Sequence, residues 1–223
     1  MLLLAVDTSG KQGSIALASC GPGEACEVIE VAELSGGTFS AELVPQIAAL
    51  LAKRKFSKAD IGAFAVVSGP GSFTGLRIGL AVIKGLAEVL VKPIVAVSLL
   101  QALASAAHLD GHVLAALDVG RNEIFLGEYE VGAAGTHLTR ERLVTRDEWL
   151  ESARGAVIVT ADDPLAEAAR AKGLRIIKAE RPRSDAIAQL GWRKILSGVT
   201  ISPEALEANY IGRSDTDLFV KGS

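Results

Sequence analysis

The chain has 223 residues, 49% of them hydrophobic and 22% charged, and a formal net charge of −3. This length and apolar content are enough for one large hydrophobic core or two smaller ones. The slightly negative net charge argues against a protein that binds nucleic acid without partners through a broad basic face. The N-terminal residues lack the basic region and cleavage site of a signal peptide, and no apolar run reaches about 18 residues, so we expect a cytoplasmic protein with no membrane span.

Short apolar runs alternate along the chain with runs whose apolar residues recur every three or four positions, a pattern typical of an α/β protein. The predicted strands are 2–6, 14–18, 27–34, 63–67, 93–97, 113–117, 123–129, 156–160 and 174–177. The predicted helices are 40–53, 76–91, 99–107, 146–153, 165–172, 186–196 and 203–208.

A glycine-rich turn, Ser-Gly-Pro-Gly-Ser at 68–72, connects a predicted strand to a predicted helix. Gly69 and Gly71 adopt a positive φ without steric cost, so they end the strand and begin a turn. A strand, a glycine-rich turn and a helix start direct backbone N–H groups toward one point, which predicts an anion site; a tight turn without a ligand is the alternative. The turn is not a Walker loop, because Leu76 and Arg77 stand where Lys and Ser or Thr are required.

Glycines recur in the helix after this turn, although each costs about 0.8–1 kcal/mol relative to alanine in a helix interior. Gly75 and Gly79 are one turn apart on one face, and Ala81 and Gly85 are one turn apart on another. We therefore expect a close neighbour on each face. The sheet of the same domain accounts for one neighbour, and another helix of this chain or of a partner accounts for the second.

A unit of strand, aspartate, turn and return strand occurs twice, half a chain apart. Asp7 ends the first strand of the chain, and Asp118 ends a strand in the second half. The repeat predicts two lobes of similar fold, which we place at 1–98 and 99–223.

Two cysteines, Cys20 and Cys26, flank a predicted turn at 21–25, so they face each other if that turn closes a hairpin. We expect two free thiols, as is usual in a reducing compartment, with a disulfide across the hairpin as the alternative.

The histidines do not predict a metal site. His108 and His112 have the spacing of a helical metal-binding pair, but Asp110 and Gly111 between them signal a turn, so the two do not share a helix face. We also find no nucleophile and base arranged as in a hydrolase, and we predict no catalytic residue.

The segment 68–79, Ser-Gly-Pro-Gly-Ser-Phe-Thr-Gly-Leu-Arg-Ile-Gly, resembles the signature of the TsaB family. This YeaZ or glycoprotease-like family supplies a subunit of the bacterial machinery that makes threonylcarbamoyladenosine at position 37 of transfer RNA. The resemblance extends to the Asp7 turn, to the Asp118 hairpin and to the segment Asn-Tyr-Ile-Gly-Arg at 209–213.

The resemblance implies an α/β protein with the two-lobe actin/Hsp70/hexokinase-like (RNase H-like) fold and duplicated mixed-sheet lobes. In that superfamily, paired aspartate hairpins face a nucleotide, although capping of their own turns is the simpler role for such aspartates. The candidate nucleotide or phosphate turn consists of Asp7, Thr8, Ser9, Gly69, Gly71 and Asp118. The superfamily's adenosine-binding glycine pair is expected near Thr160, where this chain has no glycine. We therefore expect no tightly bound cofactor in the chain alone, and ATP or ADP only at a surface shared with partners.

The catalytic TsaD-type subunits of the same machinery hold a metal through a His-x-x-x-His pair on an early helix. The matching helix here, 40–53, has no histidine, and Phe39 stands where many members keep one. The resemblance thus implies a non-catalytic scaffold that binds a TsaD-type subunit, works with a TsaE-type ATPase and meets transfer RNA indirectly through the complex. A homodimer of the free chain and a heterodimer with the partner are both open. The expected interface comprises Gly75, Leu76, Gly79, Leu80, Ile83, Leu43 and Ile47. The alternative is a stand-alone small-molecule kinase of the same superfamily, which requires the missing glycine pair.

Overall fold

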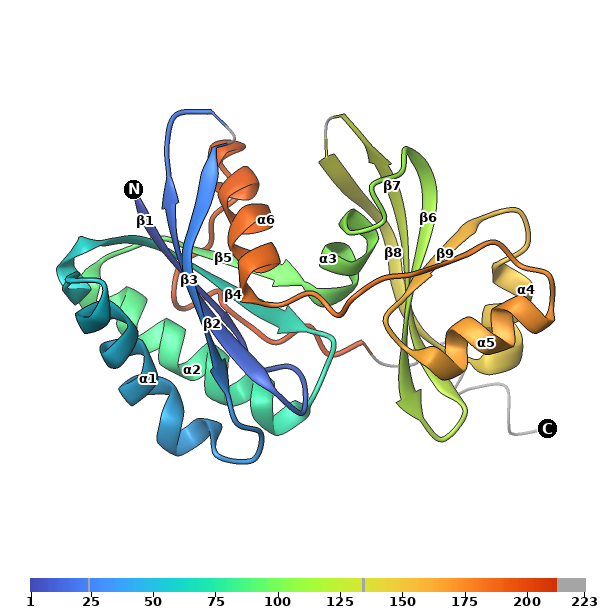
Figure 1. Ribbon diagram of the computed structural model, residues 1–223, viewed down its shortest axis with the longest axis horizontal. Coiled ribbons are helices and arrows are strands. Elements are labelled where there is room, and N and C mark those ends of the chain that lie inside the picture. The colour runs from blue at the N-terminus through green and yellow to red at the C-terminus, as the bar shows by residue number, and fades with distance from the viewer. Residues whose placement is uncertain (24, 134, 212–223) are drawn as a thin grey trace. The chain divides into compact units, whose positions relative to one another are not determined.

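A computed structural model describes residues 1–23, 25–133 and 135–211. The chain forms two compact units, each built on one five-stranded mixed sheet (Figure 1). Unit 1 contains Met1–Leu99 and Pro182–Asn209, and unit 2 contains Leu100–Arg181. This confirms the predicted α/β class with two mixed-sheet lobes.

The sheet of unit 1 has the strand order β3-β2-β1-β4-β5. β1 pairs with β2 antiparallel and with β4 parallel, and every residue of β1 is buried. Burial on both faces explains why this strand is a continuous apolar run rather than an alternating one. The strands are β1 (Leu2–Asp7), β2 (Gly13–Cys20), β3 (Cys26–Leu34), β4 (Ile61–Gly69) and β5 (Ile94–Ser98).

Helices cover both faces of this sheet. Figure 1 shows α1 and α2 on one face and α6 on the other, and α6 contacts all five strands. The helices are α1 (Phe39–Lys53), α2 (Phe73–Leu90) and α6 (Ser184–Leu196), with a 3₁₀ turn, η1 (Lys58–Asp60), before β4.

The sheet of unit 2 repeats the same topology, because its order β8-β7-β6-β9-β10 matches β3-β2-β1-β4-β5 strand for strand. β6 pairs antiparallel with β7 and parallel with β9. A hydrophobic cluster of unit 2 includes the fully buried Trp149. The strands are β6 (Gly111–Gly120), β7 (Glu123–Gly132), β8 (Gly135–Thr145), β9 (Val157–Thr160) and β10 (Ile176–Lys178), and the helices are α3 (Leu99–Ser105), α4 (Arg146–Ser152) and α5 (Asp163–Ala171). The predicted duplication is therefore present in the strand order.

The division of the chain differs from the predicted lobes at one place. The segment 182–209, assigned by sequence to the C-terminal lobe, belongs to unit 1. The reason is that α6 covers the face of the first sheet that α1 and α2 leave open, and buries Ile187 and Trp192 there.

Two further segments differ between the prediction and the structure. The predicted helix 203–208 is only a turn at 203–205, and Ile201 just before it forms a β-bridge with Ile94. The strand β8 was not predicted. No helix among the described residues is long and apolar enough to cross a membrane.

Candidate functional site

The glycine-rich turn lies where β4 ends and α2 begins, and its own chain holds it closed. Ser72 is the N-cap of α2 and its Oγ accepts a hydrogen bond from the N–H of Gly75 at 3.3 Å. The N–H of Ser72 donates to the main-chain oxygen of Ser9 at 2.8 Å. A Cβ on Gly71 would lie 2.5 Å from that same oxygen, so only glycine fits this approach.

The other side of the turn meets the C-terminal part of unit 1. The N–H of Asn209 donates to the main-chain oxygen of Ser68 at 2.7 Å, and a Cβ on Gly69 would lie 2.4 Å from the oxygen of Asn209. Gly69 also has a φ of +148°. These contacts explain both glycines by packing within unit 1, and an anion site at the turn stays a prediction.

Asp7 is a buried carboxylate that caps its own turn. Its Oδ1 accepts hydrogen bonds from the main-chain N–H and the hydroxyl of Ser9, at 2.8 and 2.6 Å. The side chain is only 4% exposed, so these bonds replace the water that a carboxylate would otherwise require. Turn capping was the simpler of the two predicted roles, and this geometry fulfils it.

Asp118 lies near the end of β6 in unit 2, at the place that matches Asp7 at the end of β1. Its Oδ1 accepts from the N–H of Gly120 at 2.7 Å, and Arg146 lies 3.7 Å from its Oδ2. Its main-chain N–H donates to the carboxylate of Asp162 at 2.8 Å. Asp162 belongs to the segment where the superfamily's glycine pair was expected, so this chain uses that position for a contact between two of its own loops.

The glycines of α2 that were predicted to approach a partner instead approach the β1–β2 turn. A Cβ on Gly75 would lie 2.1 Å from the main-chain oxygen of Thr8, and one on Gly79 would lie 2.3 Å from its hydroxyl oxygen. Thr8 is itself 2% exposed. Close approach was the correct reason for these glycines, but the neighbour is the unit's own turn.

The large apolar residues predicted at the partner interface are also turned inward. They contribute to the core between the two helices and the first sheet, where each is at most 7% exposed: Leu43, Ile47, Leu76, Leu80 and Ile83. Their burial contradicts the prediction that these residues are available to a partner, because the apolar stripe of an amphipathic helix packs first against its own core.

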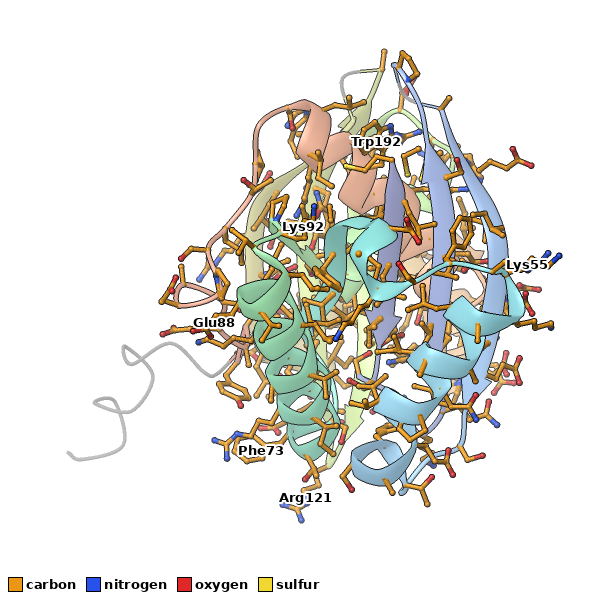
Figure 2. All side chains as sticks on the ribbon, turned by 90° about the vertical axis from the view of Figure 1, so that its left-hand side faces the viewer. Lys55, Phe73, Glu88, Lys92, Arg121 and Trp192 are labelled. Atoms are coloured by element: carbon orange, nitrogen blue, oxygen red, sulfur yellow. The ribbon has the colours of Figure 1, made fainter. Side chains whose placement is uncertain are left out.

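The opposite face of the two helices is exposed and consists largely of small and apolar side chains. We call it the outer helix face, and α1 and α2, which are in contact, present it toward the viewer in Figure 2. Val44 is 52% exposed and Val89 is 76% exposed, and a Cβ on Gly85 would meet no described atom within 4 Å. Its small and apolar exposed residues are Ala41, Val44, Pro45, Ala48, Ala49 and Ala52 of α1 with Ala81, Gly85 and Val89 of α2, and Thr74, Arg77 and Glu88 are exposed on the same side of α2.

An aromatic residue extends the outer helix face at the start of α2. Phe73, which is labelled in Figure 2, is 53% exposed. The guanidinium of Arg77 lies 3.6 Å from the centre of the Phe73 ring. Of the exposed residues of this surface, sequence reasoning singled out only Ala81 and Gly85, as one of two candidate stripes. The structure identifies theirs as the outward stripe.

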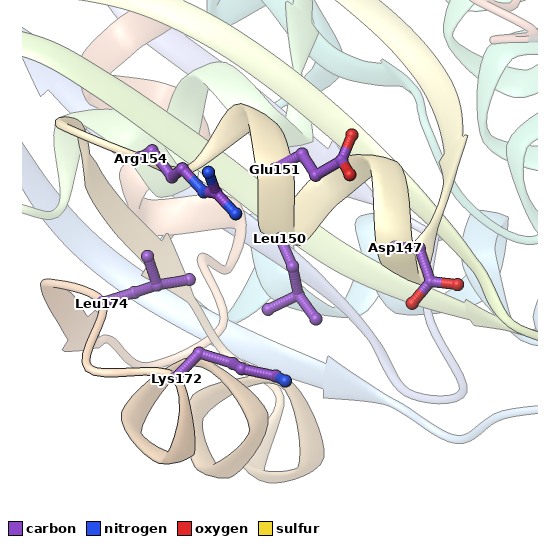
Figure 3. A pocket seen from close by; sticks show the side chains of 6 residues that line it. All are labelled: Asp147, Leu150, Glu151, Arg154, Lys172 and Leu174. Atoms are coloured by element: carbon purple, nitrogen blue, oxygen red, sulfur yellow. The ribbon is translucent and has the colours of Figure 1, made fainter.

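Unit 2 has a surface pocket of about 310 Å³ between α4 and the end of α5 (Figure 3). Leu150 points from α4 toward Lys172 in this view. Four of the six lining side chains are charged: the residues are Asp147, Leu150, Glu151, Arg154, Lys172 and Leu174. None of them was a predicted site residue.

The histidine spacing also resolves as predicted. His112 lies in β6, whereas His108 has a φ of +49° beyond the end of α3, so the two do not share a helix face. Among residues 1–23, 25–133 and 135–211, no group of three His, Cys, Asp or Glu side chains is placed to hold a metal ion.

Comparison with known proteins places the chain in a family. The family model described as "TsaD: tRNA N6-adenosine threonylcarbamoyltransferase" matches residues 31–178. The tRNA threonylcarbamoyladenosine biosynthesis protein TsaB of Haemophilus influenzae is 35% identical over 131 residues, which cover 57% of this chain and 53% of that protein. TsaB of Bacillus subtilis is 32% identical over 153 residues, covering 68% of this chain and 65% of that protein. The match thus spans between half and two thirds of the length of these relatives.

A solved structure shares the fold over nearly the whole chain. It is a protein from Pseudomonas aeruginosa described as similar to the peptidase YeaZ, with a TM-score of 0.76, 25% identity, and coverage of 94% of this chain and 99% of that one. Residues 68–79 of this chain resemble the signature of the TsaB family. The chain therefore belongs to the TsaD-related proteins and, among them, to the TsaB family.

Proposed function

We propose that this protein is a non-catalytic subunit for the synthesis of N6-threonylcarbamoyladenosine at position 37 of transfer RNA, and that it supports a TsaD-type catalytic subunit. Relatives that match it at 32–35% identity are named as biosynthesis proteins for this nucleoside. In this proposal the protein works in the cytoplasm, and a TsaE-type ATPase, transfer RNA and ATP or ADP join it only through the assembled complex.

The position of Phe39 favours a non-catalytic role for this chain. Phe39 begins α1, the helix that carries the metal-binding histidines in TsaD-type subunits, and it is 5% exposed. Its ring lies so close to Gly13 of β2 that a Cβ there would come within 2.9 Å of Cε1. An aromatic side chain that packs in the core thus stands where many members of the family keep a histidine, on a helix that has no histidine in this chain.

The outer helix face is the surface that we propose meets the catalytic subunit. A helix with small residues along its outer face lets a second helix approach closely, with its larger side chains fitting between them. Ala81 and Gly85 supply that stripe on α2, and Val44 and Val89 provide exposed apolar area beside it. Such contiguous apolar surface marks interaction sites on proteins in water.

The proposed partner is a TsaD-type protein because the TsaD family model matches this chain across both helices. A protein of that family has the corresponding pair of helices, so helix pair can meet helix pair in a pseudo-symmetric assembly. The same surface would join two copies of this chain into a homodimer when no catalytic subunit is present.

Reconstitution tests the proposed function. The TsaD-type subunit and the TsaE-type ATPase of the same organism are incubated with substrates and unmodified transfer RNA, with and without this chain, and the modified nucleoside is measured by mass spectrometry after digestion. We expect modification to depend on the chain, and the chain alone to produce none. Modification at an equal rate without the chain contradicts the proposal.

A further inference from the structure

The turn end of the β2–β3 hairpin holds two thiols in contact. Cys20 ends β2, Cys26 begins β3, and the two are directly opposite each other in the strand register. Their Sγ atoms lie 2.7 Å apart, and both cysteines are free. Cys20 is 2% exposed, whereas Cys26 is partly exposed, so a reagent in solution reaches Cys26 first.

The hydrogen bonds around Cys20 show which type of cross-strand pair this is. Its main-chain N–H donates to the oxygen of Met1 at 2.9 Å, and its oxygen accepts from the N-terminal ammonium group of Met1 at 2.7 Å. Both polar groups of Cys20 therefore face β1, and toward β3 it forms a non-hydrogen-bonded pair. Such pairs have Cα atoms about 4.5 Å apart and side chains closer together than the alternative pair type.

That separation falls within the range of about 4.4–6.8 Å between the Cα atoms of disulfide-bonded cysteines. The N–H of Gly21 donates to the oxygen of Ala25 at 2.9 Å and closes the turn, so the register of the pair is fixed. A disulfide between these residues needs no strand to shift.

We propose that Cys20 and Cys26 form a reversible dithiol–disulfide pair, oxidised by exchange with a low-molecular-weight disulfide such as glutathione disulfide, which fastens the end of the hairpin. The Cys26 thiolate attacks one sulfur of glutathione disulfide, and the first glutathione leaves as a thiolate. The Cys20 thiolate then attacks Sγ of Cys26 and displaces the second glutathione. The two protein thiols lose two electrons and two protons, and the two glutathione molecules take them up.

The hairpin end is also where α6 is held to the sheet edge. The indole N–H of Trp192 donates to the main-chain oxygen of Gly23 in the hairpin turn at 2.9 Å. In the dithiol form the thiol of Cys26 donates a weak hydrogen bond to the main-chain oxygen of Ala188, with 3.9 Å between Sγ and that oxygen. Oxidation removes this donor and stiffens the turn that Trp192 contacts. The redox state of the pair therefore alters two contacts between the hairpin and α6.

Burial governs how quickly the pair reacts. It raises the pKa of Cys20 and, together with the hydrogen bond between the two thiols, raises the pKa of Cys26 to about 12. Little thiolate is present at neutral pH, so exchange is slow there even where the disulfide is favoured at equilibrium. The pair responds to a sustained change of redox conditions rather than to a brief one.

Thiol trapping tests the proposal on the whole protein. The reduced chain is equilibrated without oxygen at graded ratios of glutathione to glutathione disulfide, quenched with acid, alkylated and weighed intact. We expect a species that has lost two hydrogen atoms, carries no alkyl group and returns to the dithiol with dithiothreitol. Accumulation of protein–glutathione mixed disulfides in place of this species overturns the proposal. So does a folded chain that keeps two alkylatable thiols at every ratio, under conditions in which the urea-unfolded chain is oxidised.

Single variants and hydrogen exchange complete the test. Cys20→Ala should retain one glutathione on Cys26, whereas Cys26→Ala should react little because Cys20 is buried. Amide exchange of residues 20–26 should slow by about tenfold in the oxidised form, because opening of the turn becomes restricted. Equal exchange in the two forms contradicts the fastening of the hairpin.

Discussion

Thr8, on the β1–β2 turn, donates its hydroxyl proton to the main-chain oxygen of Gly75 in the first turn of α2, at an oxygen–oxygen distance of 2.7 Å. The bond joins residues 67 positions apart and is buried. Because Gly75 and Gly79 lack side chains, α2 lies directly on this turn, and the Asp7 hairpin and the signature segment form one rigid corner of unit 1.

This contact predicts opposite effects for two glycines of the same helix. Gly79→Ala should destabilise unit 1 by about 1–3 kcal/mol, because its Cβ would overlap the Thr8 side chain. Gly85→Ala should stabilise α2 by about 1 kcal/mol, because it faces open space and alanine is the better helix former. Urea unfolding followed by circular dichroism measures both. Equal stability of the two variants would show that the Thr8 contact does not constrain the helix.

The two hairpin aspartates should differ in their contribution to stability. Asp7→Ala leaves the N–H of Ser9 without its acceptor in a buried site, which should cost about 1–3 kcal/mol. Asp118→Ala removes a cap whose side chain is 29% exposed, so water replaces it and the cost should be about 0.5–1 kcal/mol. Chemical denaturation of both variants against the parent provides the comparison. A larger loss for Asp118→Ala would contradict the assignment of Asp7 as the structural cap.

An ion pair between β3 and the end of α1 should make stability depend on acid pH. Hydrogen bonds from Lys53, and then from Arg54, hold the pKa of Glu30 below its usual value. A lowered folded-state pKa gives stabilisation that is complete above the ordinary glutamate pKa of about 4.3 and is lost as the pH falls through the lowered value. Glu30→Gln should therefore be less stable than the parent at neutral pH and equal to it in stronger acid.

The contribution should be small because Lys53 and Arg54 are well exposed, and added salt should reduce it further. Unfolding midpoints of parent and variant, measured from neutral to acid pH at two salt concentrations, provide the test. A stability difference that persists undiminished in strong acid would show that Glu30 acts by packing rather than by charge.

Local sequence patterns were sufficient to predict most strands, the glycine-rich turn between a strand and a helix, and the repeated hairpins. They did not predict β8, whose segment Thr139–Arg142 is polar and whose position at the sheet edge leaves much of it exposed. They also did not indicate that α6 packs on the first sheet, because the apolar stripe of a helix does not identify the sheet that it covers.

The faces of α2 were ambiguous for a related reason. Two stripes of small residues, Gly75 with Gly79 and Ala81 with Gly85, are equivalent in sequence, and only the position of Thr8 distinguishes them. Contacts between residues far apart in the chain decide such cases, and they leave no periodic signal. Sequence reasoning thus identified both candidate stripes, and the structure shows that Ala81 and Gly85 face outward.

The most direct test of the account is the dissociation constant between this chain and the TsaD-type subunit of the same organism, measured by isothermal titration calorimetry. Ala81→Leu on the outer helix face is compared with Ala171→Leu, which changes another exposed alanine, at the end of α5 in unit 2. Circular dichroism confirms that both variants are folded. We predict that Ala81→Leu weakens binding by at least about tenfold, because a bulky side chain separates closely packed helices, and that Ala171→Leu binds as the parent does. Unchanged binding by a folded Ala81→Leu variant would contradict the proposal that the outer helix face holds the catalytic subunit.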